Sequence, residues 1–218
     1  MWDAIIQGIE KSALTVVALV AFGGLMILIG VLRSRIQKML SKTLVLTEIR
    51  NSQKITEILV EIRVKCKGDR AAVYLFHNGE RYTNGNSILR LSGAYETVGP
   101  GISSQLPNGQ GILVSSVQEA VEFLADEQRS EKVYYKEVQH IPGCAYKATL
   151  EAQGVDAVAK FPLHDGEDVI GFVCVDFVQR KPAVGELITI PKAAGRLEWY
   201  LKNSKKPGFW ARILRRSK

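Results

Sequence analysis

The N-terminal part of the chain contains twenty consecutive residues, Ala13 to Leu32, that carry no charge. Thr15 is the only residue with a hydroxyl group among them. A helix of this length extends about 30 Å at about 1.5 Å per residue, which matches the hydrocarbon core of a bilayer. A helix buried in a soluble protein normally keeps a polar stripe, and this run has none. The sequence therefore predicts a transmembrane helix over residues 13–32.

A cleaved signal peptide is the main alternative for this run. The residues before it, Met1 to Ser12, contain Asp3, Glu10 and only one base, Lys11. A signal peptide begins with a basic segment, has a shorter apolar core and ends at a small-residue cleavage site, and none of these features is present. The pattern favours an uncleaved anchor.

The charges on either side of the predicted span indicate its orientation. Four bases follow it with no acid between them: Arg33, Arg35, Lys38 and Lys42. Basic flanks stay in the cytoplasm, so residues 1–12 form a short extracytoplasmic N-terminus and the remainder faces the cytoplasm. We expect a single-pass protein of the inner (cytoplasmic) membrane.

The formal net charge of +7 comes from the C-terminal end of the chain. Residues 202–218 contain seven bases and no acid, whereas residues 43–201 contain 17 bases and 20 acids. A nucleic-acid-binding domain normally carries an excess of bases, so the central part does not favour nucleic acid as a partner.

The last residues form a basic amphipathic segment, 204–218. Phe209, Trp210, Ile213 and Leu214 would share one face of a helix there. Such a segment lies well at an anionic lipid surface. A disordered tail and a nucleic-acid contact are the alternatives. The residues predicted to contact the membrane surface are Arg33, Arg35, Lys38, Trp210, Arg212, Arg215 and Arg216.

The helical pattern continues beyond the predicted span. No Pro or Gly occurs from Val31 to Lys67, and Gly68-Asp69 then ends the segment. We predict a helical stalk over residues 33–67. Its apolar spacing fits either a short coiled coil, which would make a homo-oligomer, or packing on the domain's own sheet.

The rest of the chain alternates between strand and turn patterns. Strands are predicted over residues 70–77, 87–98, 157–163 and 169–178, and Asp165-Gly166 is a favoured hairpin turn. Residues 190–202 predict a closing helix, and the glycine-rich residues 99–111 predict a loop over the mouth of a pocket. The fold class is α+β: a membrane helix, a stalk and an antiparallel sheet flanked by helices.

This order of elements resembles the GAF domain family over residues 55–202. The segment FPLHDGEDVIGFVCVDF, Phe161 to Phe177, is similar to the penultimate GAF hairpin, with Pro162, Gly166 and Gly171 at matching places. VYLFHNG, Val73 to Gly79, is similar to the early GAF strand. The resemblance implies a GAF-like domain over residues 68–203.

The resemblance also implies a ligand pocket. The predicted ligand-binding residues are Tyr74, Phe76, His77, Asn78, Arg81, Arg90, Tyr95 and Glu96. The structural alternative is that Asn78-Gly79 is only a turn, that Arg90 and Glu96 form a surface pair, and that the aromatic residues belong to the core. The sequence does not identify a cofactor.

Signals for catalysis are weak. His140 and His164 lack metal-ligand spacing, and Asp165, Glu167 and Asp168 occupy a hairpin turn where acids are normally solvated. The chromophore-attaching cysteine and the cyclic-nucleotide signature of other GAF domains are not evident.

Three widely spaced cysteines, Cys66, Cys144 and Cys174, suit a reducing compartment and favour buried thiols. Only Cys144 lies in a plausible loop for a GAF-type methionine sulfoxide reductase.

We therefore expect a binding or signalling module that is not an enzyme. A membrane-organising or tethering protein, of a kind that also occurs among phage host-modifying factors, is the alternative.

Overall fold

The computed structural model describes the fold of residues 2–125 and 132–204. Side chains are described from Phe22 onward, except for residues 37–44, 184 and 203–204 within helices. The chain divides into two compact units, residues 1–48 with 207–218, and residues 49–206. The predicted tail contacts at Trp210, Arg212, Arg215 and Arg216, and the side chain of Lys38, lie outside the described residues.

The first unit contains most of helix α1, Trp2–Lys65. Large apolar side chains between Phe22 and Leu32 are about half or more exposed, including Ile27 at 71%. Within the part of the chain whose side chains are described, no helix is long and apolar enough to cross a membrane. Residues 13–21, the first part of the predicted span, lie outside that part.

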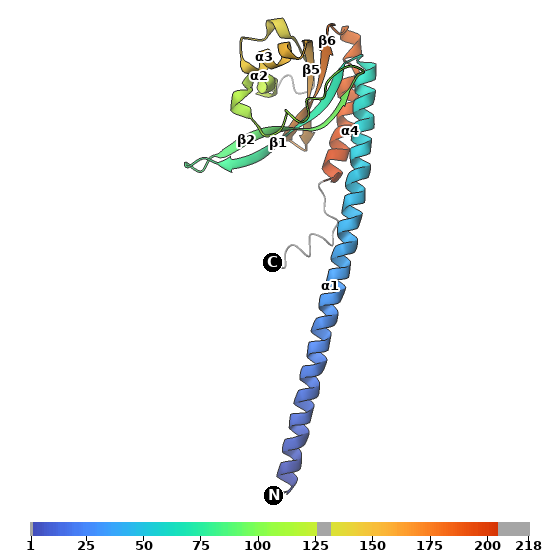
Figure 1. Cartoon of the computed structure of the whole chain (residues 1–218), viewed down its shortest axis with the longest axis vertical. Coiled ribbons are helices and arrows are strands. Elements are labelled where there is room, and N and C mark those ends of the chain that lie inside the picture. The colour runs from blue at the N-terminus through green and yellow to red at the C-terminus, as the bar shows by residue number, and fades with distance from the viewer. Residues whose placement is uncertain (1, 126–131, 205–218) are drawn as a thin grey trace. The chain divides into compact units, whose positions relative to one another are not determined.

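The second unit is built on a six-stranded antiparallel sheet with the order β3-β2-β1-β6-β5-β4 (Figure 1). The strands are β1 Arg70–Arg81, β2 Ser87–Val98, β3 Ile112–Leu113, β4 Tyr134–Glu137, β5 Val155–Asp165 and β6 Asp168–Val178. β2, β5 and β6 lie close to their predicted positions, whereas β1 continues past the predicted end at His77 to Arg81. The expected turn at Asn78-Gly79 is wrong: both residues lie in β1, and the chain turns between Tyr82 and Asn86 instead. The central pairing joins β1 to β6, whose residues are about a hundred positions apart in sequence.

The β5–β6 hairpin is confirmed where the sequence places it. Asp165 pairs with Asp168, and Gly166 has a φ of +73°, which glycine adopts at little cost. Farther along β6, a Cβ atom on Gly171 would lie 2.1 Å from the carbonyl oxygen of Tyr74. The absence of a side chain at Gly171 therefore lets β6 approach β1 closely.

One face of the sheet is covered by the end of α1 and by α4, Thr189–Ser204 (Figure 1). Ile55, Leu59 and Ile62 of α1 are fully buried against the sheet, and Leu197 of α4 packs beside them. Burial of side chains of this size contributes roughly 1.5–3 kcal/mol each. Of the two alternatives for the stalk, this last part packs on the domain's own sheet.

The other face carries short helices, among them α2, Gln118–Val121, and α3, Ala145–Ala152 (Figure 1). Single-turn helices occupy Val114–Ser116, Glu122–Ala125 and Val138–His140, and another lies at Val184–Glu186. Phe123, Leu150 and Phe172 belong to a second core cluster on this face. The sequence did not predict α3. Successive side chains of a strand alternate between faces, so β6 contributes to both clusters.

Candidate functional site

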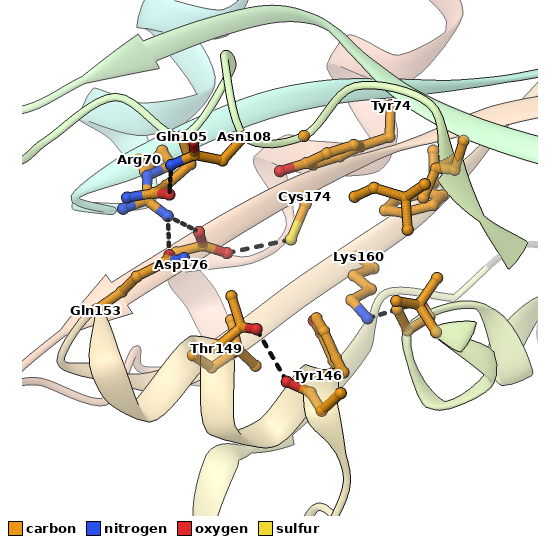
Figure 2. A pocket seen from close by; sticks show the side chains of 18 of the residues that line it. Arg70, Tyr74, Gln105, Asn108, Tyr146, Thr149, Gln153, Lys160, Cys174 and Asp176 are labelled. Atoms are coloured by element: carbon orange, nitrogen blue, oxygen red, sulfur yellow. Dashed lines mark hydrogen bonds and ion pairs between the residues drawn. The ribbon is translucent and has the colours of Figure 1, made fainter.

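A cavity of about 310 Å³ lies between the sheet and the short helices. Its floor is formed by β1, β5 and β6, and its walls include α2, α3 and the loop that contains Gln105 and Asn108 (Figure 2). The predicted loop over residues 99–111 therefore does border the cavity. The volume is at the lower end of the range typical of small-molecule sites.

The strand register explains which side chains reach the cavity. Arg70 pairs with Asp176, and Tyr74 pairs with Phe172, so these residues share a face. Lys160 of β5 pairs with Cys174 of β6 in the same way. Because neighbouring strands place paired residues on one side, these polar groups come together under the short helices.

A buried ion pair closes one end of the cavity. Nη1 of Arg70 donates to Asp176 Oδ2 and to Gln153 Oε1, at 2.8 Å each. Nη2 donates to the Ser103 carbonyl oxygen at 3.3 Å. Nε lies 3.5 Å from Glu96 Oε1 but makes no hydrogen bond among the described residues. With 3% of its surface exposed, Arg70 holds two acids in a nearly water-free environment.

Burial governs the titration of the groups beside this pair. It raises the pKa of Asp176, although the Arg70 guanidinium opposes the shift. The thiol of Cys174 donates to Asp176 Oδ1 over 3.2 Å, and burial raises its pKa well above the ordinary value. Cys174 is therefore a protonated thiol and a poor nucleophile at neutral pH.

Lys160 occupies the other end of the floor. Its Nζ donates to the carbonyl oxygen of Ala120 at 2.7 Å, and only 1% of the residue is exposed. The centroid of the Tyr146 ring lies 4.6 Å from Nζ, and the rings of Phe123, Phe172 and Tyr134 lie within 6 Å. Burial lowers the pKa of the Lys160 amine to about 8.

Aromatic side chains form much of the apolar surface around these groups. The rings of Tyr74 and Phe172 stack with centroids 5.4 Å apart, and Phe123 meets Phe172 edge-on at 5.7 Å. Burial raises the pKa of both Tyr74 and Tyr146, so both phenols stay protonated. Among the described residues neither phenol oxygen has a hydrogen-bond partner, and both residues line the cavity.

Glu96 fixes the loop that covers the cavity. Its carboxylate accepts hydrogen bonds from the backbone N–H groups of Gln105, at 2.9 Å, and Leu106, at 3.3 Å, and from the Ser104 hydroxyl. The Gly93 N–H donates to the Gly109 carbonyl oxygen at 2.7 Å. The loop is thus attached at several points and contributes fixed polar groups to the wall.

The predicted ligand-binding residues do not form a single group. Tyr74 lines the cavity. Glu96 does not line it, but its carboxylate lies 3.5 Å from Nε of Arg70, which does. Phe76 is in the second core cluster, with its ring centroid 6.3 Å from that of Phe172. Tyr95 packs against the α1–α4 cluster on the opposite face of the sheet.

The remaining four predicted residues lie on the outer part of the β1–β2 hairpin. His77, Asn78 and Arg81 are exposed, and His77 Nε2 lies 2.8 Å from Ser92 Oγ. Arg90 donates from Nη1 to the Gly111 carbonyl oxygen at 2.7 Å. None of the four lines the cavity. Their assignment to a ligand remains a prediction for a site other than this cavity.

The sequence analysis missed Arg70, Lys160 and Tyr146 as site residues. A charged residue inside an apolar strand was the available signal, since Lys160 interrupts AVAKFPL. Asp176 interrupts VCVDFV in the same way. Charges at such places are rarely fully buried unless they are paired or bind something.

The three cysteines are free, and Cys144 and Cys174 both belong to the second core cluster. Cys66 belongs to the α1–α4 cluster, Cys174 lines the cavity, and Cys144 precedes α3, where its sulfur accepts a hydrogen bond from the Lys147 N–H at 3.4 Å. In the described part of the chain, no three His, Cys, Asp or Glu side chains gather to form a metal site.

Solved structures that are similar to this chain include GAF domains. The phycoerythrobilin-bound GAF domain from a cyanobacterial phytochrome matches with a TM-score of 0.55 at 15% identity, covering 77% of this chain and 95% of its own. The phycocyanobilin-bound GAF domain from a cyanobacterial phytochrome matches with a TM-score of 0.54 at 17% identity, and the match covers 76% of this chain and 94% of that domain. The blue-light-absorbing form of the Thermosynechococcus elongatus PixJ GAF domain matches with a TM-score of 0.53 at 18% identity, and the match covers 73% of this chain and 93% of that domain.

These likenesses confirm the expected α+β, GAF-like fold. No known family profile matches the sequence, and no curated protein matches it either.

Proposed function

We propose that this chain is a membrane-tethered sensory module whose GAF-like domain binds a small organic molecule in the cavity between its sheet and α3. The observation that carries the proposal is the polar content of the cavity. Lys160 and the phenols of Tyr74 and Tyr146 surround a volume of about 310 Å³ with hydrogen-bonding capacity left over. Buried polar groups in folded proteins are normally satisfied, so free ones facing a cavity favour a ligand that completes them.

The related solved structures support a binding role in a general way. Two of them are named for a bound bilin. Cys174 lines the cavity of this chain, but its thiol is buried and protonated, which does not favour covalent attachment of a chromophore. The proposal is therefore a noncovalent ligand.

Membrane attachment is the second part of the proposal. It rests on the uncharged residues 13–32 and on the exposed apolar side chains between Phe22 and Leu32. Arg33 and Arg35 follow directly and are exposed, where they can contact anionic headgroups. The domain then lies on the cytoplasmic side of the inner membrane, and a signal passes to a protein partner or to a second copy of the chain through residues 33–54.

A ligand screen on the full-length protein in a non-ionic detergent tests the binding role. We expect at least one small organic molecule to raise the thermal unfolding temperature of the natural chain. Ala145→Trp places a large ring at an exposed position that lines the cavity, so it should abolish the shift. Ala148→Trp, at an exposed position of α3 that does not line the cavity, is the matched control. A shift that is unaffected by Ala145→Trp would place binding elsewhere.

A further inference from the structure

Within residues 2–125 and 132–204, Lys160 is a buried cation without an acidic partner. The one hydrogen bond that its Nζ makes there, to the Ala120 carbonyl oxygen, uses one of the three donors of an ammonium group. Among the described residues no carboxylate lies within ion-pair distance of Nζ. Burying a charge without a counter-charge is unfavourable, so either the amine is neutral or an anion joins it in the occupied site.

The aromatic rings around Nζ compensate for this charge only in part. Tyr146 is the nearest ring at 4.6 Å from its centroid, and the other three lie at 5.8 to 5.9 Å. Cation–π contacts stabilise an ammonium group by less than the cost of burying its charge. The rings also form flat apolar walls next to the amine.

The opposite end of the cavity holds one cation, Arg70, which already has two carboxyl partners. Asp176 and Glu96 both lie beside Arg70, at 2.8 and 3.5 Å. In Figure 2, Arg70 and Asp176 lie at the left of the view and Lys160 lies farther to the right, with Cys174 between them. Lys160 is therefore the one unpaired cation among the described residues that line the cavity, which suits a ligand with a single negative charge.

The two phenols add donors of the right kind. Tyr74 and Tyr146 are kept protonated by burial, and each has an O–H without a partner among the described residues. A carboxylate accepts several hydrogen bonds at once, from an ammonium group and from hydroxyl groups. A phosphate would bring a second negative charge, and the other cation among the described lining residues, Arg70, is already paired with Asp176 and Glu96.

We propose that the cavity binds a flat aromatic monocarboxylate, with its carboxylate on the Lys160 amine and its ring between the aromatic walls. This inference rests on the proposed binding function and names its ligand class. The Arg70–Asp176–Gln153 group at the other end would bind a polar substituent on the ring.

Calorimetric titration of the full-length protein in a non-ionic detergent tests the assignment. The probes are indole-3-acetate and 4-hydroxyphenylacetate, each paired with its neutral amide. At pH 7 we expect at least one acid to bind about tenfold or more tightly than its amide, since the amide loses the charge-assisted hydrogen bond. Lys160→Met should remove this preference. Lys136→Met, which removes a nearby amine that does not line the cavity, should retain it.

The pH dependence of the natural chain provides a test that needs no variant at Lys160. Indole-3-acetate stays ionised across the range, so its affinity should be constant below about pH 7.5. Above pH 8 the amine loses its proton, and affinity should fall by up to about tenfold per pH unit. The other charged or titratable groups around the amine are Cys174 and Asp176 on β6, Glu122 after α2, Tyr134 and Lys136 on β4, Tyr146 on α3, and Tyr74 and Arg70 on β1.

Three results would overturn the inference. The amides could bind as tightly as the acids, the preference could survive Lys160→Met with affinity independent of pH, or both acids could fail to bind. If neutral molecules bind and Ala145→Trp blocks them, the binding function stands and only the ligand class is wrong. If a broad panel including these acids gives no binding at all, both proposals fail.

Discussion

Arg70 Nη1 lies 2.8 Å from Asp176 Oδ2, and the two residues face each other across the central β1–β6 pairing. Both are buried, at 3% and 7% exposure. Glu96 joins them from β2 and at the same time holds the loop over the cavity. One ion-pair group therefore links three strands of the sheet to the wall of the site.

Removal of the cation should destabilise the fold strongly. Arg70→Met leaves Asp176 and Glu96 buried without a counter-charge, and breaking a buried pair in this way costs about 3–5 kcal/mol. Arg196→Met is the control. It removes an ion pair between Arg196 and Glu61 in which the Arg196 side chain is about half exposed. The substitution should therefore lower the free energy of unfolding by less than about 1 kcal/mol. Denaturant unfolding of the full-length protein in detergent measures both, and equal losses would contradict this account.

The stability of the fold should depend on pH through Lys160. Its pKa in the folded protein is about 8, below the value of 10.5 expected for the unfolded chain. The unfolded state therefore holds the extra proton between these values, and stability rises as the pH increases through that window. Relative to Lys160→Met, the natural chain should gain roughly 3 kcal/mol between pH 7 and pH 10.5. A difference that stays constant would show that the amine titrates normally.

Gly171 should not tolerate a side chain. In Gly171→Ala the new Cβ would lie 2.1 Å from the Tyr74 carbonyl oxygen, so β1 and β6 must move apart. Overpacking of this kind costs about 1–3 kcal/mol, and here it also displaces Tyr74 and Phe172 from the cavity floor. Gly185→Ala, with no atom within 4 Å of its new Cβ, is the control and should leave the unfolding free energy nearly unchanged.

Deletion of residues 13–32 should release the chain from the membrane. The full-length protein is expected in the membrane fraction after alkaline carbonate washing, and the shortened chain in the supernatant. Protease added outside intact cells should leave the domain undigested, because the basic residues Arg33 and Arg35 keep it in the cytoplasm. A full-length protein that washes off with carbonate would contradict the tether.

Local patterns made much of the fold predictable from the sequence. Alternation, turn residues and helical spacing depend on neighbours along the chain, and they placed β5, β6 and α4 within a few residues. The helix α3 was missed because Cys144 caps it, and cysteine is not a usual capping residue.

The site was harder to predict because it depends on which face of each strand meets the cavity. Both faces of the central strands are buried, so their sequences do not distinguish the α1–α4 side from the cavity side. That assignment follows from the register of Arg70 with Asp176 and of Lys160 with Cys174, and pairing across long separations leaves no local signal. His77, Asn78 and Arg81 lie where β1 continues past the covered part of the sheet, and a turn dipeptide at Asn78-Gly79 gave no sign of that continuation.

Native mass spectrometry of the full-length protein released from detergent tests the central claim most directly. The natural chain and Ala148→Trp should each retain a noncovalent small-molecule adduct, either carried through purification or formed with an added aromatic carboxylate. Ala145→Trp should retain none, because its indole occupies the mouth of the cavity. An adduct of equal abundance in all three proteins, or its absence from all three, would contradict a ligand site between the sheet and α3.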